Sequence, residues 1–325
     1  MDAVTDQQAV GFGFLAMIAE DMYAGPNLSS RCPPVDARIA AAGWTVVAYL
    51  TAEDVLFPAK GAASQRLSRD PSKRVFFGFL ARSSTDPDSY AAVVRGTEGI
   101  VEWVIDAEFL LIPHPHHPGV RVEEGFWDIY QTMSLADVAT GQTTHQNAAE
   151  GVAELVEPGT VTVVGHSLGS ALATYLTSDI AERLGPKVSA CLFASPRTGD
   201  QAWVNLFAAT VGQYRLFNYI LDVVPHVPTI GYVALPGATV IQPATAQASI
   251  QLDLLCDHHA ICYCAMIDYA LPPPVTRQDA SSKACISPPP MPKAAIILAA
   301  IINRFTPGRG WGHATLKLLH RLRRI

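Results

Sequence analysis

Residues 165–169 read Gly-His-Ser-Leu-Gly, a G-x-S-x-G pattern with Ser167 at its centre. This pattern is typical of a strained turn that exposes a nucleophilic serine, and glycines leave room for the chain to pass close on either side. The β-branched run from Val161 to Val164 predicts a buried strand before the turn, and the apolar residues after it have helical spacing. Strand, turn and helix together favour a catalytic serine over an ordinary turn of small residues.

A catalytic serine needs a base to take its proton and an acid to orient that base. Where such a turn joins a strand to a helix, the order along the chain is Ser, then Asp or Glu, then His. Asp222 fits the acid, because it follows a strand-like segment, residues 214–221, and precedes a loop stiffened by Pro225 and Pro228. Asp200 is the competing carboxylate.

Several histidines follow Asp222 and are candidates for the base. His226 is too close to the acid in sequence, and His313 and His320 lie in a basic tail beyond proline-rich linkers. The adjacent pair His258 and His259 remains. Residue type alone does not show which of the two is the base.

Strands and helices alternate through the first 270 residues, which predicts a mostly parallel sheet with helices on both faces. We expect one domain over residues 1–271 and a C-terminal helical extension over residues 272–325, with proline-rich stretches at the junction. Helices are expected at residues 7–24, 125–133, 146–156, 202–211 and 258–270, and strands at 43–50, 74–81, 90–94, 188–194 and 214–221.

Several segments together resemble the class-3 lipases, the family that includes the secreted fungal lipases. The resemblance spans about residues 40–270 and departs from the family at Glu123, where many members carry histidine. The segments that carry it are Arg95-Gly-Thr97 with Trp103 and Asp106, Gly125-Phe126 with Tyr130, the Gly-His-Ser-Leu-Gly turn, Phe193 to Asp200, and Asp222-x-Val-Pro-x-x-Pro228.

The resemblance implies an α/β-hydrolase fold and hydrolysis of carboxylic esters, with acylglycerols as expected substrates. It implies a Ser167, Asp222 and His258 triad. His258 is preferred over His259 because Tyr263 stands five residues after it, a spacing that many family members show.

The resemblance also implies the oxyanion hole and a lid. The backbone N–H of Leu168 would supply one donor, and Thr97 would supply the other through its N–H and its hydroxyl. The amphipathic segment over residues 98–111 is either a mobile lid or a fixed surface helix. Phospholipase A activity and a catalytically silent membrane-binding module are the alternative functions.

Composition sets further limits. The 325 residues are 49% hydrophobic with a formal charge of −6, which argues against a nucleic-acid binder. Residues 289–325 carry seven basic and no acidic side chains, so this tail either contacts an anionic membrane or packs as a solvated helix. The start of the chain shows no cationic signal segment, and we expect a cytoplasmic or peripheral membrane protein, with export by a signal-less route left open.

Three cysteines surround the histidine pair, at Cys256, Cys262 and Cys264. We expect no metal here, because structural zinc sites usually have two separated ligand pairs and a catalytic histidine cannot also be a ligand. A disulfide within this cluster, or from it to Cys285, stays open if the protein is exported. No cofactor is expected.

Overall fold

The computed structural model describes residues 3–24, 30–53, 74–97, 109–270, 285–288 and 293–305, with side chains up to residue 299. Most of the expected lid, including Trp103 and Asp106, lies outside these residues, and so does the basic helix expected near the C-terminus. The division at residue 271 therefore stays a prediction.

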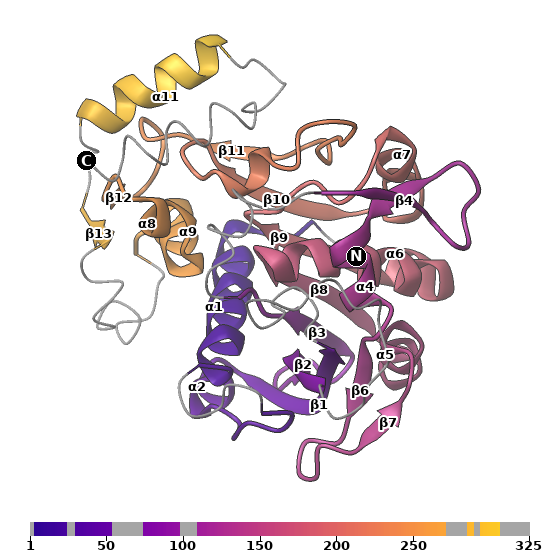
Figure 1. The fold of residues 1–325 in the computed structure, drawn as a ribbon. Coiled ribbons are helices and arrows are strands. Elements are labelled where there is room, and N and C mark those ends of the chain that lie inside the picture. The colour runs from indigo at the N-terminus through magenta and orange to yellow at the C-terminus, as the bar shows by residue number, and fades with distance from the viewer. Residues whose placement is uncertain are drawn as a thin grey trace.

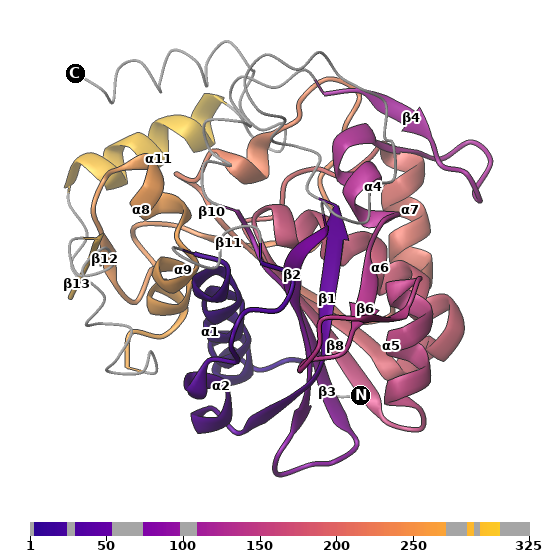
Figure 2. The ribbon, with the colours of Figure 1, turned by 60° about the horizontal axis from the view of Figure 1, so that its bottom comes forward.

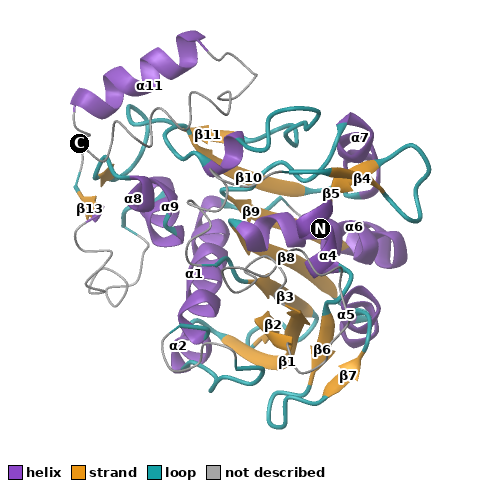
Figure 3. Ribbon diagram, viewed as in Figure 1, coloured by secondary structure: helices purple, strands orange, loops and turns teal. Residues whose placement is uncertain are grey.

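One nine-stranded sheet forms the centre of the molecule, in the order β11-β10-β9-β8-β3-β2-β1-β6-β7 (Figures 1 and 3). Neighbours from β3 to β11 pair in parallel, and the pairs from β3 to β7 are antiparallel, so that seven of the nine strands share one direction. The sheet is thus mostly parallel in strand direction, as predicted. Its strands are β1 (Trp44–Glu53), β2 (Arg74–Ser83), β3 (Ser89–Val94), β6 (Ser134–Ala136), β7 (Thr143–His145), β8 (Thr160–His166), β9 (Val188–Phe193), β10 (Tyr214–Tyr219) and β11 (Thr239–Ile241).

Helices cover both faces of the sheet (Figures 1 and 2). On one face α1 (Asp6–Met22) packs against β3 and β8 and against α9 (Ala260–Ile267). On the other, α6 (Leu168–Leu184) packs against β8 and β9, flanked by α4 (Glu124–Tyr130), α5 (Ala148–Val156) and α7 (Gln201–Thr210). Strand β8 is buried from Val161 onwards because both of its faces are covered, which is why its sequence is a continuous apolar run.

Shorter elements complete the described part of the chain. Strands β6 and β7 are not predicted from the sequence, because three residues each are too few for a periodic signal. The remaining elements are α2 (Ala37–Ala41), β4 (Leu111–Pro113), β5 (Arg121–Glu123), the 3₁₀ turns Gly185–Lys187 and Val224–His226, β12 (Ser249–Ile250), β13 (Ile286–Ser287) and α11 (Lys293–Phe305).

The single helix expected over residues 258–270 is wrong, because two helices meet there. Helix α8 (Leu254–His258) begins at Asp253, whose carboxylate accepts the N–H groups of Leu255 and Cys256. His259 is extended, with φ −60° and ψ 135°, and α9 starts after it. This break makes the side chains of His258 and His259 leave the backbone in different directions.

The C-terminal side of the molecule is tied to α8 and α9 by two short links. Strand β13 pairs with β12, and a disulfide joins Cys285 to Cys256 of α8. Helix α11 lies on the same side of the molecule as α8 in both ribbon views, with Ala295 and Ala299 buried (Figures 1 and 2). Among the described residues, no helix has both the length and the apolar character needed to cross a bilayer.

Candidate active site

Ser167 sits between the end of β8 and the start of α6, in a strained backbone conformation with φ 59° and ψ −128°. A non-glycine residue adopts positive φ only where the surrounding structure enforces it. Two glycines make the turn possible. A Cβ on Gly165 would fall on the carbonyl oxygen of Gly169, and a Cβ on Gly169 would fall on the carbonyl oxygen of Val94. Strand, turn and helix thus cross too closely for any larger residue.

The three residues expected to form a triad lie in one hydrogen-bonded row. Nε2 of His258 is 2.7 Å from Oγ of Ser167, and Nδ1 of His258 is 2.8 Å from Oδ2 of Asp222. All three side chains are buried, with Ser167 and Asp222 each 1% exposed and His258 5% exposed. The row has the order nucleophile, imidazole, carboxylate that general-base activation of a serine requires.

Asp222 follows β10 and is held from several sides. Its Oδ1 accepts the N–H of Val224 at 3.0 Å, and its Oδ2 accepts the hydroxyl of Tyr263 at 2.7 Å. The Tyr263 oxygen in turn accepts the N–H of Tyr219 at 2.9 Å. Burial, and then the nearby charge of Asp222, raise the pKa of Tyr263 well above its usual value, so this phenol remains a donor.

The competing residues have other partners. Asp200 caps α7, accepting the N–H of Trp203 at 3.0 Å, and pairs with Arg121 at 3.0 Å. His226 is half-buried, and desolvation lowers its pKa to about 4. The Nδ1 atom of His259 lies 3.8 Å from Sγ of Cys285, away from the serine. His313 and His320 lie outside the described residues.

A second pair, which the sequence did not predict, supports the row through the backbone of His258. Nδ1 of His166 is 2.7 Å from Oε1 of Glu20 in α1, and its Nε2 is 2.7 Å from the carbonyl oxygen of His258. Burial alone would lower the pKa of His166, but the Glu20 carboxylate raises it overall. Burial would likewise raise the pKa of Glu20, and His166 lowers it overall. The partners of the two ring nitrogens of His166 are a carboxylate oxygen and a carbonyl oxygen, and both of these accept.

This pair could not be found from sequence, because Glu20 and His166 are 146 residues apart. Only the packing of α1 across β8 brings them together. The one available signal is that Glu20, with Asp21 after it, follows a mostly apolar run near the end of the helix.

The loop expected to supply an oxyanion donor lies against the serine. Gly96 donates its N–H to Oε1 of Glu20 at 3.2 Å, and a Cβ on Gly96 would lie 3.3 Å from Cβ of Ser167. Arg95 fixes this loop, because its guanidinium is buried and donates to the carbonyl oxygens of Phe76 at 2.7 Å and of Gly96 at 2.8 Å.

The two residues expected to donate hydrogen bonds to the oxyanion lie in different segments of the chain. Thr97 is the next residue of the Arg95–Gly96 loop and is partly exposed. Leu168 opens α6, where the first N–H groups have no acceptor within the helix. Leu168 is the residue after the serine, and Thr97 follows Gly96, which lies against the serine, and their roles as donors stay a prediction.

Glu123, the departure from the family pattern, has a structural role. Its carboxylate caps α4 by accepting the N–H of Phe126 at 2.7 Å. Burial raises the pKa of Glu123 to about 7, although the N–H groups that it accepts act in the opposite direction. The side chain is 3% exposed and lies outside the hydrogen-bonded row of the triad.

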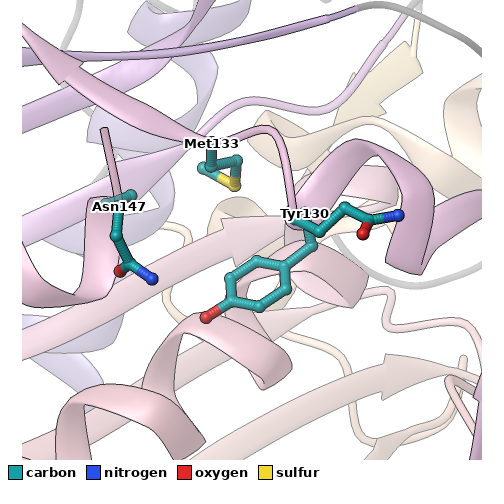
Figure 4. Close-up of a pocket in the computed structure, with 5 residues that line it drawn as sticks. Tyr130, Met133 and Asn147 are labelled. Carbon is teal, nitrogen blue, oxygen red and sulfur yellow. The ribbon is translucent and has the colours of Figure 1, made fainter. Parts of the chain in front are cut away.

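Two pockets on the described part of the chain lie away from this row. One is lined by Tyr130, Met133 and Asn147 among others (Figure 4). The hydroxyl of Tyr130 donates to Asp179 of α6. The second is lined by residues of β1, β2 and the segment around β7. Neither includes Ser167, so the assignment of the site rests on the hydrogen bonds of the triad and not on a cavity.

Comparison with known proteins finds a family that matches part of the chain. The model of the family described as lipase (class 3) matches residues 91–232. A lipase of Rhizomucor miehei is 31% identical over 157 residues, which are 47% of this chain and 41% of the relative. Phospholipase A1-II 4 of Oryza sativa subsp. japonica is 32% identical over 157 residues, 42% of this chain and 39% of the relative. The chain thus spans about two fifths of the length of either relative.

The solved structures identify the fold. A Rhizomucor miehei lipase in complex with its propeptide superposes with a TM-score of 0.51 at 20% identity, covering 74% of this chain and 70% of that one. The nine-stranded sheet, with its elbow between β8 and α6, is an α/β-hydrolase fold. Residues 91–232, which contain Ser167 and Asp222, are similar to the lipase (class 3) family.

Proposed function

We propose that this protein is a serine hydrolase that cleaves the carboxylic esters of lipids. The observation that carries the proposal is the continuous row from Oγ of Ser167 through the His258 imidazole to Oδ2 of Asp222, with spacings of 2.7 and 2.8 Å. A buried serine on a strained turn, within hydrogen-bond distance of a base that is itself held by a carboxylate, is arranged for acyl transfer.

The reaction begins when Oγ of Ser167 attacks the ester carbonyl and Nε2 of His258 takes the serine proton. Asp222 holds the imidazole through Nδ1 and stabilises the imidazolium that forms. The negatively charged former carbonyl oxygen accepts hydrogen bonds from the N–H of Leu168 and from Thr97, and each such donor contributes about 10²–10³ in rate.

Collapse of this intermediate passes the proton from His258 to the leaving alcohol and leaves the acyl group on Ser167. Water then attacks the acyl-enzyme, with His258 again as the base, and the fatty acid is released. His166 supports both steps through its 2.7 Å hydrogen bond to the carbonyl oxygen of His258, which fixes the backbone that carries the base.

The names of the relatives support lipid esters as the substrate class. They include a lipase, a phospholipase A1 and a secreted mono- and diacylglycerol lipase of Penicillium cyclopium. Neutral acylglycerols are our first candidate. Phospholipids are the second, favoured by the phospholipase A1 relatives and by a tail of seven basic residues that could meet anionic headgroups.

The test compares the wild type with Ser167→Ala on emulsified triacylglycerol, diacylglycerol and phosphatidylcholine, measuring released fatty acid by titration. The wild type is expected to release fatty acid from at least one of the three, and Ser167→Ala to lose at least about 10³-fold in rate. Full activity of Ser167→Ala would overturn the proposal, and the preferred lipid would decide between the two substrate candidates.

We further propose that the basic tail brings the enzyme to anionic membranes, on the basis of its charge alone. Replacing Arg321, Arg323 and Arg324 with glutamine should weaken sedimentation with phosphatidylserine vesicles, and replacing them with lysine should not. Equal binding by both variants and the wild type would end this idea.

A further inference from the structure

Four side chains of the types that bind soft divalent metals meet where α8 and α9 join. A ring nitrogen of His259 and the sulfurs of Cys262 and Cys285 all lie within 4.8 Å of one another. The sulfur of Cys256 is one bond from that of Cys285, because the two form the disulfide. The cluster therefore brings together three sulfurs and one imidazole nitrogen.

The spacing of these atoms suits a tetrahedral site. Zinc–sulfur bonds of about 2.3 Å and zinc–nitrogen bonds of about 2.0–2.1 Å place the ligand atoms roughly 3.5–3.8 Å apart. Nδ1 of His259 is 3.8 Å from Sγ of Cys285. The cluster is also largely enclosed, with Cys262 fully buried and Cys256 and Cys285 only 6% and 5% exposed.

From sequence, a metal was not expected, because the ligands do not form two separated pairs and because His258 is needed for catalysis. In the structure, neither of these two reasons excludes a metal. The bend at His259 directs His258 toward Ser167 and leaves His259 facing the cysteines. Cys285 follows α9 in the chain. The pairing of β12 with β13 places it beside the cysteines of α8 and α9.

We propose that, when the Cys256–Cys285 disulfide is reduced, Cys256, His259, Cys262 and Cys285 bind one zinc ion. A dithiol reductant supplies two electrons and two protons to the disulfide, giving two thiols, and is itself oxidised to a disulfide. Zinc then displaces the protons of the three thiols, and Nδ1 of His259 donates its lone pair without losing a proton. The disulfide and the metal are thus alternative cross-links between the helix carrying His258 and the segment at Cys285.

The first measurement uses the full-length wild type. Oxidised and phosphine-reduced samples are incubated with zinc chloride, desalted, and analysed for metal by mass spectrometry. The reduced chain is expected to retain a single zinc ion and the oxidised chain none. Cobalt chloride added to the reduced chain should give the sulfur-to-metal charge transfer and visible bands of tetrahedral thiolate coordination. Failure of the reduced wild type to retain zinc overturns the proposal.

The second measurement locates the ligands. Cys262→Ser and His259→Asn should each weaken zinc binding by at least about tenfold. Cys264→Ser is the matched control, because Cys264 is a buried cysteine of the same helix whose thiol contacts the carbonyl oxygen of Val10 in α1. Zinc binding by Cys262→Ser and His259→Asn that equals the control would assign the metal elsewhere and contradict this site. None of these readouts depends on ester hydrolysis.

Discussion

Tyr263 donates its phenolic proton to Oδ2 of Asp222 at 2.7 Å, on the same oxygen that faces Nδ1 of His258. Two donors thus converge on one carboxylate oxygen, one from α9 and one from α8. The tyrosine oxygen also accepts the N–H of Tyr219, so it links α9 to the end of β10. This relationship gives a physical role to the residue that, by its spacing from His258, distinguished the two histidines in the sequence.

Tyr263→Phe should weaken both the reaction and the fold. The carboxylate loses one donor, and the buried N–H of Tyr219 loses its acceptor. We expect kcat to fall about tenfold and the free energy of unfolding to fall by about 1–3 kcal/mol. Ester hydrolysis and urea unfolding measure the two effects. Unchanged values of both would show that Asp222 does not depend on this tyrosine.

Glu20→Gln should destabilise the protein most near pH 6. The raised pKa of His166 adds stability that is present below its unfolded value of about 6.5 and is lost as pH rises through the folded value. The lowered pKa of Glu20 adds stability above its unfolded value that is lost as pH falls through the folded value. Between the titration of Glu20 and that of His166, we therefore expect the free energy of unfolding of the variant to be about 1–3 kcal/mol lower than that of the wild type. The difference should be smaller at pH 3 or 10, and urea unfolding at these pH values and at pH 6 measures it.

Glu182→Gln is the matched control for this pair. Glu182 also contacts a histidine, His117, at 3.1 Å, but its side chain is 44% exposed. Such surface pairs contribute at most about 1 kcal/mol, and this variant should unfold almost like the wild type. Equal effects of the two variants on the free energy of unfolding at pH 3, 6 and 10 would count against a special role for the pair of Glu20 and His166.

Glu123→Gln should stabilise the protein at alkaline pH. Because the folded pKa of about 7 is above the unfolded value, stability falls as pH rises from about 4.5 to 7. Glutamine keeps an oxygen for the N–H of Phe126 but never acquires the buried charge. Above pH 7 the variant should be more stable by up to about 3 kcal/mol, and below pH 4 the difference should vanish. Denaturation curves at pH 4 and 8 measure this, and a difference independent of pH would contradict it.

Gly165→Ala should prevent the elbow from forming. Its new Cβ would meet the backbone of Gly169 at the crossing of β8 and α6, where neither element can move without displacing Ser167. We expect a destabilisation above about 4 kcal/mol or loss of soluble protein. Gly11→Ala in α1 is the control, because a Cβ there meets nothing within 4 Å and should stabilise the helix by about 0.5–1 kcal/mol. Normal folding of Gly165→Ala would refute the close crossing.

The parts of the site that sequence could predict are those written in local patterns. The run from Val161 to Gly169 predicts its own strand, turn and helix, and Asp222 follows from the end of a strand. What sequence could not predict depends on packing between distant segments. Glu20 reaches His166 across 146 residues. The Cys256–Cys285 disulfide is one of several pairings that the sequence left open, and only the fold selects it. The bend at His259 was missed because the apolar residues on either side have no break in their pattern.

The central claim is that Ser167 is the nucleophile and His258 its base. It is tested most directly by labelling the oxidised protein with a fluorophosphonate ester and locating the adduct by peptide mass spectrometry in the wild type, His258→Ala and His259→Ala. We predict an adduct on Ser167 in the wild type and in His259→Ala, with labelling of His258→Ala slower by at least about 10³-fold. An adduct on another residue, or equal labelling of His258→Ala, would contradict the account.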